Sequence, residues 1–299
     1  MSYVTRDIDG KSYVEAREFN LLNLGIRYIK DGGRETLPFL EDLFVRRFRE
    51  VGDYPVSSLD DLIGSQSRNE NETARKIRTR NPPPSYYGKE TLAALCSGDI
   101  HYMIRLVGRM VEENGGAEAL RVCQDLPKIK PKEQHGVIRA AAGDFLESVR
   151  MLPKHGIQLA AIVTAFGNVA RSLLLYETSK NEKGNPPRQA SRIEPYEALN
   201  LSQEANDLLK ELLRYSIFLY DPRGKSRRGH VVPRLYLRRY LVPHFNLTFS
   251  QRDSIELENK EIEKLLMQPQ EFETEKRRKA KKGDGTTEDM FIEGSDDSK

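Results

Sequence analysis

Hydrophobic positions recur at three- and four-residue steps in many segments of the chain, and this pattern predicts a mainly α-helical fold. The segments with such steps are residues 13–50, 100–111, 137–149, 156–176, 202–213 and 259–267. Ser97 is the predicted N-cap of the second helix, and Asp99 stands where the helix dipole favours a carboxylate. Ser202 is the predicted N-cap of the helix that carries Leu208, Leu209, Leu212 and Leu213.

The pattern changes after about residue 200, where β-prone and polar positions mix with the helical steps. A β-rich run is expected at 216–220, followed by a Gly/Arg/Lys-rich turn. Short strands are expected at 247–249 and 255–257, and the residues between them, 250–253, have the composition of a hairpin turn. The C-terminal part is therefore predicted to be an α/β module.

Polar segments without an apolar period separate the predicted units. Residues 64–85 end in three prolines, and residues 177–200 centre on Gly184-Asn185-Pro186-Pro187, so both are predicted to be linkers or loops. The tail from residue 273 is basic and then acidic, and we expect it to be disordered. The predicted units are residues 1–63 (helical segment), 64–85 (linker), 86–176 (helical domain), 177–200 (linker), 201–272 (α/β module) and 273–299 (tail).

Composition narrows the class of protein. The charged share is 31% and the hydrophobic share 38%, as expected of a folded chain with much exposed surface. The net charge of +3 is too small, averaged over the chain, to indicate a nucleic-acid partner. Cys96 and Cys123 have no metal-ligand spacing, and the N-terminus has no secretory pattern. Asn168 and Arg171 interrupt the apolar stretch 156–176, which favours a buried helix over a membrane span. We expect a soluble, cytoplasmic protein with no membrane partner.

Residues 214–239 hold eight basic residues and a single acid, Asp221, with three tyrosines interleaved and a fourth, Tyr240, directly after them. Guanidinium groups and loop-borne cations are what phosphate binding requires. The candidate nucleic-acid contacts, with one arginine from the predicted turn at 250–253, are Arg223, Lys225, Arg227, Arg228, Arg234, Arg238, Arg239 and Arg252. A helix, a basic segment and a short hairpin follow in the order of a winged-helix module. The alternative is that Arg234, Arg238 and Arg239 pair with acids of the preceding domain and hold two units together.

No complete catalytic motif is present. Gly224-Lys225-Ser226 lacks the upstream glycine and strand of a phosphate loop, so we expect no ATP hydrolysis by this chain alone. Glu256, Glu258 and Lys260 follow a strand-like segment and leave open a metal-dependent nuclease, although a solvated strand-to-helix edge is the strongly favoured explanation. The five histidines show no ligand spacing. We therefore predict no catalytic residue, no cofactor and no metal.

Three phrases carry a family resemblance: YYGKETLAALCSGDIHYMIRLVGRM (86–110), ASRIEPYEALN (190–200) and RLYLRRYLVPHFNLTFSQRDSIEL (234–257). In order, they resemble the C-terminal part of bacterial origin-recognition-like AAA+ ATPases. The resemblance implies a helical lid, which follows the ATPase core, and then winged-helix DNA-binding elements. The fold expected from it is mainly α, with a helical AAA+ lid-like block followed by a winged-helix-like α/β module.

The step at residues 97–100 resembles the sensor-2 turn of that lid. The family places an arginine directly after the hydrophobic residue, where it touches a nucleotide phosphate. Here His101 stands at that position and Arg105 lies a turn later, so the sensor-like candidates are Asp99, His101 and Arg105. The phosphate loop and the acidic metal-binding strand of the ATPase core are missing. The chain is then either a separately encoded or truncated C-terminal half, or a degenerate relative that works without ATP.

The predicted function is a non-enzymatic DNA-binding or DNA-linked regulatory module. Its expected partners are duplex DNA and a separate AAA+ ATPase core or another protein subunit. A protein-interaction adaptor, with the arginines in a partner interface, is the alternative from another class. The metal-dependent nuclease is the third.

Overall fold

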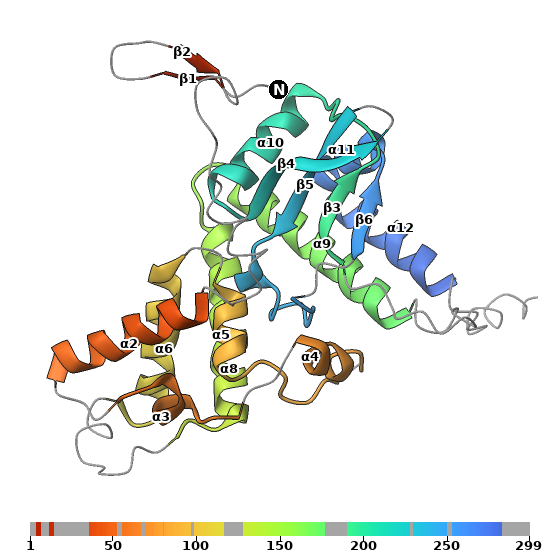
Figure 1. Cartoon of the computed structure of the whole chain (residues 1–299). Coiled ribbons are helices and arrows are strands. Elements are labelled where there is room, and N and C mark those ends of the chain that lie inside the picture. The colour runs from red at the N-terminus through yellow and green to blue at the C-terminus, as the bar shows by residue number, and fades with distance from the viewer. Residues whose placement is uncertain are drawn as a thin grey trace, which may run out of the picture.

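The chain was analysed as a computed structural model (Figure 1). It describes residues 4–6, 12–14, 36–52, 56–66, 70–79, 81–96, 99–116, 128–176, 190–227, 230–249 and 253–282. Most of the structure is helical, with a small mixed sheet in the C-terminal part, so the predicted mainly α fold is confirmed. The helices are α2 (Thr36–Gly52), α3 (Leu59–Ile63), α4 (Glu70–Lys76), α5 (Lys89–Leu95), α6 (Ile100–Glu113), α8 (Pro131–Arg150), α9 (Gly156–Tyr176), α10 (Gln203–Arg214), α11 (Asn259–Met267) and α12 (Pro269–Lys282). The strands are β1 (Val4–Arg6), β2 (Ser12–Val14), β3 (Ala190–Pro195), β4 (Phe218–Arg227), β5 (His230–Leu237) and β6 (Asp253–Leu257).

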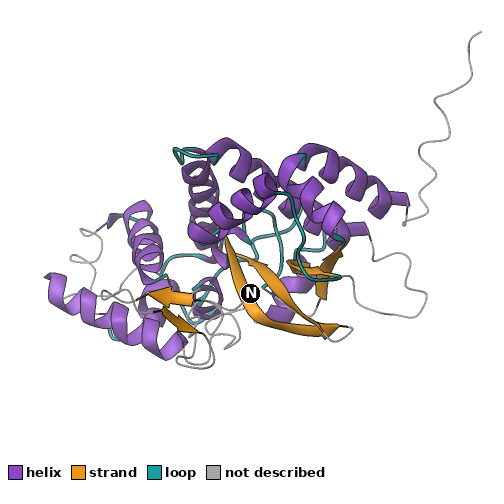
Figure 2. Ribbon diagram, turned by 90° about the horizontal axis from the view of Figure 1, so that it is seen from above, coloured by secondary structure: helices purple, strands orange, loops and turns teal. Residues whose placement is uncertain are grey.

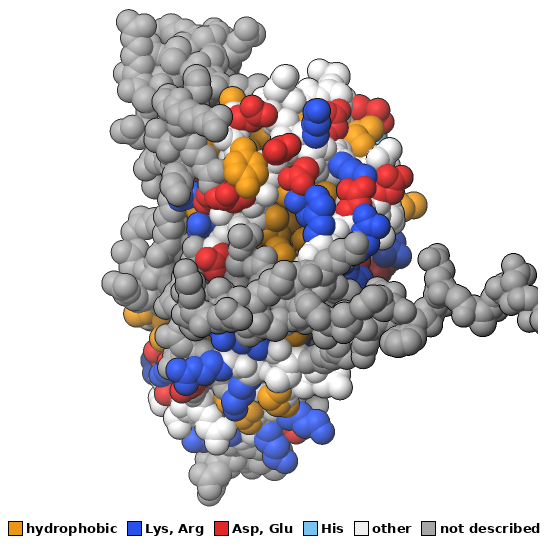
Figure 3. All heavy atoms as spheres, turned by 90° about the vertical axis from the view of Figure 1, so that its right-hand side faces the viewer, with side chains coloured by type: hydrophobic (Ala, Val, Ile, Leu, Met, Phe, Trp, Pro, Cys, Tyr) orange, Lys and Arg blue, Asp and Glu red, His pale blue; other side chains and the backbone are white. Residues whose placement is uncertain are grey.

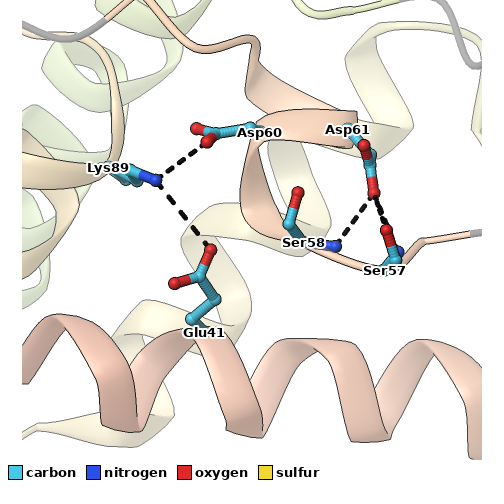
Figure 4. A network of polar contacts seen from close by, with 6 residues as sticks. All are labelled: Glu41, Ser57, Ser58, Asp60, Asp61 and Lys89. Carbon is cyan, nitrogen blue, oxygen red and sulfur yellow. Dashed lines mark hydrogen bonds and ion pairs between the residues drawn. The ribbon is translucent and has the colours of Figure 1, made fainter.

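The N-terminal helices gather in the lower part of Figure 1, where α2, α3 and α5 pack on one another. Lys89 of α5 lies 2.8 Å from Asp60 of α3 and 4.0 Å from Glu41 of α2, so one ammonium group contacts all three helices (Figure 4). Asp61 accepts hydrogen bonds from the backbone N–H groups of Ser57 and Ser58, which fixes the start of α3. These bonds, with that from the Ser57 hydroxyl, lower the pKa of Asp61.

Helix α2 confirms part of the helix predicted at 13–50, but Ser12–Val14 is a strand that pairs antiparallel with β1. The predicted linker 64–85 contains helix α4, whose Thr73 and Ala74 are buried, as is Ile77 just beyond it. A helix of two turns has too few positions to show a period, which is why this segment was misjudged.

The N-cap of helix α6 lies two residues after the N-cap predicted from the sequence. Asp99 is the N-cap, and its carboxylate accepts a hydrogen bond from the Tyr102 N–H at 3.3 Å. Ser97, the cap predicted from the sequence, lies outside the described residues. Helix α8 begins at Pro131, whose missing N–H and fixed φ suit the first helical position.

Helix α9 is the apolar helix predicted at 156–176, and it is a core helix. Its stretch Gly156–Leu175, with mean hydropathy 1.4, is long and apolar enough to cross a membrane by length and composition alone. In the structure, 61% of that stretch is buried inside the protein, in agreement with the buried helix predicted from the sequence. Gly167 lets the ring of Phe245 lie directly on the helix, since a Cβ there would come within 2.4 Å of that ring.

The sheet has the strand order β4-β5-β3-β6. Strand β3 lies in the predicted linker 177–200, yet it pairs antiparallel with β5 and parallel with β6. The hairpin predicted around residues 250–253 is wrong, because β6 finds its partner some sixty residues earlier in the chain. Leu247 and Phe249 are buried but form no strand. Their burial explains why they resemble a strand in sequence.

The Gly/Arg/Lys-rich turn predicted after residue 220 is a long β-hairpin. Strand β4 continues to Arg227 and β5 begins at His230, with a shift of register between Asp221 and Lys225. Seen from above, its strands lie along one side of the molecule with helices behind them (Figure 2). The hairpin of the C-terminal part is thus β4–β5 and not the one expected around residues 250–253.

The predicted tail begins inside helix α12, which packs along α9. Phe272 is 2% exposed, and Glu273 accepts a hydrogen bond from Asn168 of α9 at 3.0 Å. The basic run from residue 276 thus continues an ordered helix to Lys282, and residues 283–299 lie outside the described part. One cluster of buried residues runs from Leu40 to Phe272 and joins the helical block to the sheet.

We expect Phe272→Ala to lower the free energy of unfolding by about 3–5 kcal/mol, because it removes a buried ring between α12 and α9. Arg278→Ala, on the exposed side of the same helix, is the control and should change it by about 0.5 kcal/mol or less. Urea titrations of both variants measure the difference. Equal stabilities would show that α12 does not dock on the body.

His135 joins α8 to the segment before α5. Its Nδ1 accepts hydrogen bonds from the N–H groups of Ser85 (3.2 Å) and Tyr86 (3.3 Å), and its ring stacks on that of Tyr86. Burial, with a smaller contribution from Arg139, lowers the pKa of His135 to about 4. The unfolded chain therefore binds the proton more tightly, and stability is lost as the pH falls from about 6.5 towards 4.

We expect wild-type protein to lose about 1–2 kcal/mol through His135 between about pH 7 and pH 4.5, allowing for the partial exposure of the ring. His135→Asn keeps an acceptor without titrating, so it should flatten this part of the pH profile. Burial also lowers the pKa of His244, so some slope should persist. Urea titrations across this pH range provide the measurement, and an unchanged slope in His135→Asn would contradict the assignment.

Candidate nucleic-acid interface

Arg234 lies on β5 and contacts a buried carboxylate of the neighbouring strand. Its Nε is 2.8 Å from Oε1 of Glu194 on β3, and Nε of Arg192 is 3.1 Å from the same oxygen. Glu194 is 3% exposed. Two guanidinium groups therefore balance one carboxylate within the sheet, and the Arg192 guanidinium also lies 5.7 Å from the ring centroid of Tyr236.

Arg238 follows β5 and reaches into the helical block. It forms an ion pair with Asp99, the N-cap of α6, and is itself 6% exposed. Its guanidinium lies 4.8 Å from the ring centroid of Tyr102 and 4.7 Å from that of Phe145. A cation over two aromatic faces, with a carboxylate at its side, is well compensated for its burial.

Arg239 is the first residue of the 3₁₀ helix η1 (Arg239–Leu241), which packs against α5 and α8. Its Nη1 donates to the carbonyl of Ala94 at the end of α5, at 3.0 Å. Its guanidinium lies 6.0 Å from the ring centroid of Phe249. Arg239 is 6% exposed, so this side chain also holds the sheet to the helices.

Of these three arginines, only Arg238 fully fits the alternative in which they pair with acids of the preceding domain. Arg238 pairs with an acid of the helical block, Arg239 uses a carbonyl of that block, and Arg234 uses an acid on β3. Sequence reasoning missed their partners, because Glu194 lay in a predicted linker and Ala94 contributes only its backbone. The rings of Tyr102, Phe145 and Tyr240 were not anticipated as a cluster, since each belongs to a different segment.

The remaining candidates belong to the β4–β5 hairpin and its surroundings. The backbone of Arg223, Lys225 and Arg227 lies in β4, which is an edge strand of the sheet. Arg228 and Arg252 lie outside the described residues. Three of these five cations therefore share one strand, and their role in binding stays a prediction.

The sensor-like candidates lie around the start of α6 but differ in their contacts and exposure. Asp99 is engaged by Arg238 and the Tyr102 N–H, whereas His101 and Arg105 are exposed. Arg105 lines a groove of about 590 Å³ between α6 and α8, with Arg109 and Tyr240. Arg109 is paired with Glu113 and Asp144, and burial raises the pKa of Tyr240 to about 12. Arg105 is thus the sensor-like residue with access to a groove.

The described residues form no metal-ligand cluster of the kind that the nuclease alternative requires. Glu256 lies on β6 in register with Glu194, and Glu258 is the N-cap of α11, where Lys260 is the second residue. Within the described ranges there is no group of three or more His, Cys, Asp or Glu side chains placed to hold a metal ion.

Comparison with known protein families gives one match. A family model described as ORC-CDC6-like matches residues 57–257, from just before α3 to the end of β6. No curated protein and no solved structure matches the chain. The matched region includes all three sequence phrases that carry the resemblance to origin-recognition-like ATPases.

Arg238→Ala should lower the free energy of unfolding by about 3 kcal/mol, because it leaves two rings and a carboxylate without their cation. Asp99→Ala should cost less, about 1 kcal/mol, since Asp99 keeps 34% of its side chain exposed. The double variant should reveal a coupling of about 1 kcal/mol in a double-mutant cycle. Arg214→Ala, at a side chain 71% exposed, is the matched control. Additive effects of Arg238→Ala and Asp99→Ala would contradict the ion pair.

Proposed function

The chain belongs to the ORC-CDC6-like family, and from this premise we propose that it is a non-enzymatic DNA-binding or DNA-linked regulatory module of an AAA+-type assembly. Its C-terminal unit acts as the winged-helix-like element, and the helical block before it acts as the lid-like element. Duplex DNA is the proposed ligand. A separate AAA+ ATPase core, or another protein subunit, is the proposed partner of the helical block.

The order of elements supports the winged-helix-like assignment. Helix α9, strand β3, helix α10 and the hairpin β4–β5 follow one another, and β3 pairs antiparallel with β5. A winged helix also has a strand that pairs with its hairpin, the wing, but it has two helices between them, and the described residues have α10 alone there. The parallel strand β6 and the helices α11 and α12 are additions to that pattern.

The observation that carries the proposal is the basic hairpin at the sheet edge. Arg223, Lys225 and Arg227 follow one another along edge strand β4, and Arg228 comes next in the sequence. Helix α10 exposes acids as well as bases, among them Glu204 and Lys210, so it is the less suitable surface for a duplex. We therefore assign the phosphate contacts to the hairpin.

Arg234, Arg238 and Arg239 are left out of this interface because their guanidinium groups contact Glu194, Asp99 and Ala94. The same contacts weaken the adaptor alternative, since these arginines need no partner protein. An adaptor would have to use the hairpin cations instead. DNA binding at low salt separates the two functions.

We expect Arg227→Ala/Arg228→Ala to weaken binding to unrelated duplexes by similar factors, because phosphate contacts carry no sequence information. Each lost contact removes about 0.9 from the salt slope of log Kobs, so the slope should fall by about two. Fluorescence anisotropy with labelled duplexes at several salt concentrations measures both quantities.

Arg46→Ala is the control, because Arg46 lies on α2 with 72% of its side chain exposed and is paired with Asp42. It should leave the affinity and the slope unchanged. Wild-type protein that ignores DNA at low salt would overturn the proposal and favour the adaptor.

A further inference from the structure

A second basic surface lies on the helical block, away from the hairpin, and its cations belong to α4, to the residues just after it and to the first half of α8. Arg75 is exposed in the last turn of α4, and Arg78 follows it half-buried. Lys132 and Arg139 are exposed on α8. Figure 3 shows Lys and Arg side chains gathered on the lower part of the face that bears α4, with scattered acidic side chains among them. We call Arg75, Arg78, Lys132 and Arg139 the α4–α8 face.

Helix α9 positions both parts of this face without using the four cations. Helix α8 packs along α9, and Arg171 of α9 donates to the carbonyls of Ile77 and Thr79, just after α4, the latter at 2.7 Å. His135 of α8 accepts from Ser85 and Tyr86, which follow α4 in the chain. The relative position of α4 and α8 therefore does not depend on the four cations of the face.

Among the described residues, none of the four forms an ion pair with an acidic side chain, and Arg78 Nε is buried without a hydrogen-bond partner. Nearby charges repel as well: burial, and less strongly Arg75, lower the pKa of Arg78, and burial with a smaller effect of Arg139 lowers the pKa of Arg171 against the opposite effect of Tyr86. Like charges held together at a cost in stability are typical of a surface that binds an anion.

The part of α8 between Lys132 and Arg139 has little side-chain bulk. Gly136 is exposed, and a Cβ added there would meet no atom within 4 Å. Lys132 and Arg139 are seven positions apart, about 10 Å along the helix, which corresponds to about three nucleotide steps of a strand. A polyanion can therefore approach the backbone of α8 closely and contact both cations.

We propose that the α4–α8 face binds the phosphate backbone of a nucleic acid, as a contact surface separate from the β4–β5 hairpin. The inference rests on the cations of the helical block and not on the proposed role of the hairpin. None of the exposed large hydrophobic side chains, Phe39, Met151, Ile157 and Tyr196, lies on this face. Insertion into a lipid surface is therefore disfavoured, because it requires such side chains.

The test uses the full chain and introduces a negative charge at Gly136, where there is room for a side chain. Gly136→Glu puts a carboxylate between Lys132 and Arg139 without a clash, and Gly136→Ala is the matched control. Both changes raise helix propensity, so neither should unfold the protein. We expect Gly136→Glu to weaken binding of a labelled random-sequence duplex or its single strand by about tenfold at low salt, and Gly136→Ala to bind like wild type.

Arg75→Ala/Arg139→Ala measures the contacts directly. Two lost phosphate contacts should lower the ratio of Kd between about 200 and 50 mM salt by about tenfold. Melting curves should stay near wild type, because surface substitutions have small effects on stability.

The outcomes separate this inference from the function of the hairpin. Normal binding by Gly136→Glu and by Arg75→Ala/Arg139→Ala, with weakened binding by Arg227→Ala/Arg228→Ala, overturns the second surface alone. Weakened binding by the α8 variants with a normal hairpin variant supports the face and overturns the hairpin. Wild-type binding to anionic vesicles that Gly136→Glu abolishes, with nucleic-acid binding unchanged, assigns the face to lipid and overturns the inference.

Discussion

The burial of Arg238 between two aromatic rings and a carboxylate joins the two parts of the molecule. The arginine leaves the end of β5 and neutralises Asp99, while Asp99 in turn caps α6. The guanidinium also lies over Tyr102 of α6 and Phe145 of α8. A single side chain thus fixes where α6 begins, how α6 meets α8 and how both meet the sheet. Arg239 adds a hydrogen bond to the end of α5, so Arg238 contacts α6 and the next residue contacts α5.

Segments with a long apolar period were predictable, because several turns of one face must be buried together. Helices α6, α8 and α9 are of this kind, and so is α10 with its Ser202 cap. Segments whose burial depends on a distant partner were not predictable. Strand β3 is recognisable only once β5 and β6 pair with it, and α12 only once α9 covers Phe272. Both segments are rich in polar and charged residues, so neither shows an apolar pattern in the sequence.

The sequence predicted which segment carries the candidate site, but not which side chains contact one another there. The density of arginines after residue 214 identified the region that matters, but arginine serves phosphate binding and buried pairing equally well. What separates the two uses is the partner: Asp99, Ala94 and Glu194 come from three different segments. The α4–α8 face escaped the sequence argument for the same reason, since Arg171 of α9 positions the residues just after α4, and His135 of α8 binds the segment that leads to α5.

The continuous core has a consequence for any nucleic acid that contacts both the hairpin and the α4–α8 face. One cluster of buried residues spans the helical block and the sheet, so the two basic surfaces are held in a fixed relation. A duplex is stiff over about 150 base pairs, and bending it costs free energy that depends on its sequence. A rigid protein with two separated phosphate contacts therefore favours bent or readily deformed duplexes over straight ones. Selectivity would then arise from the shape of the nucleic acid, without a side chain that reads a base edge.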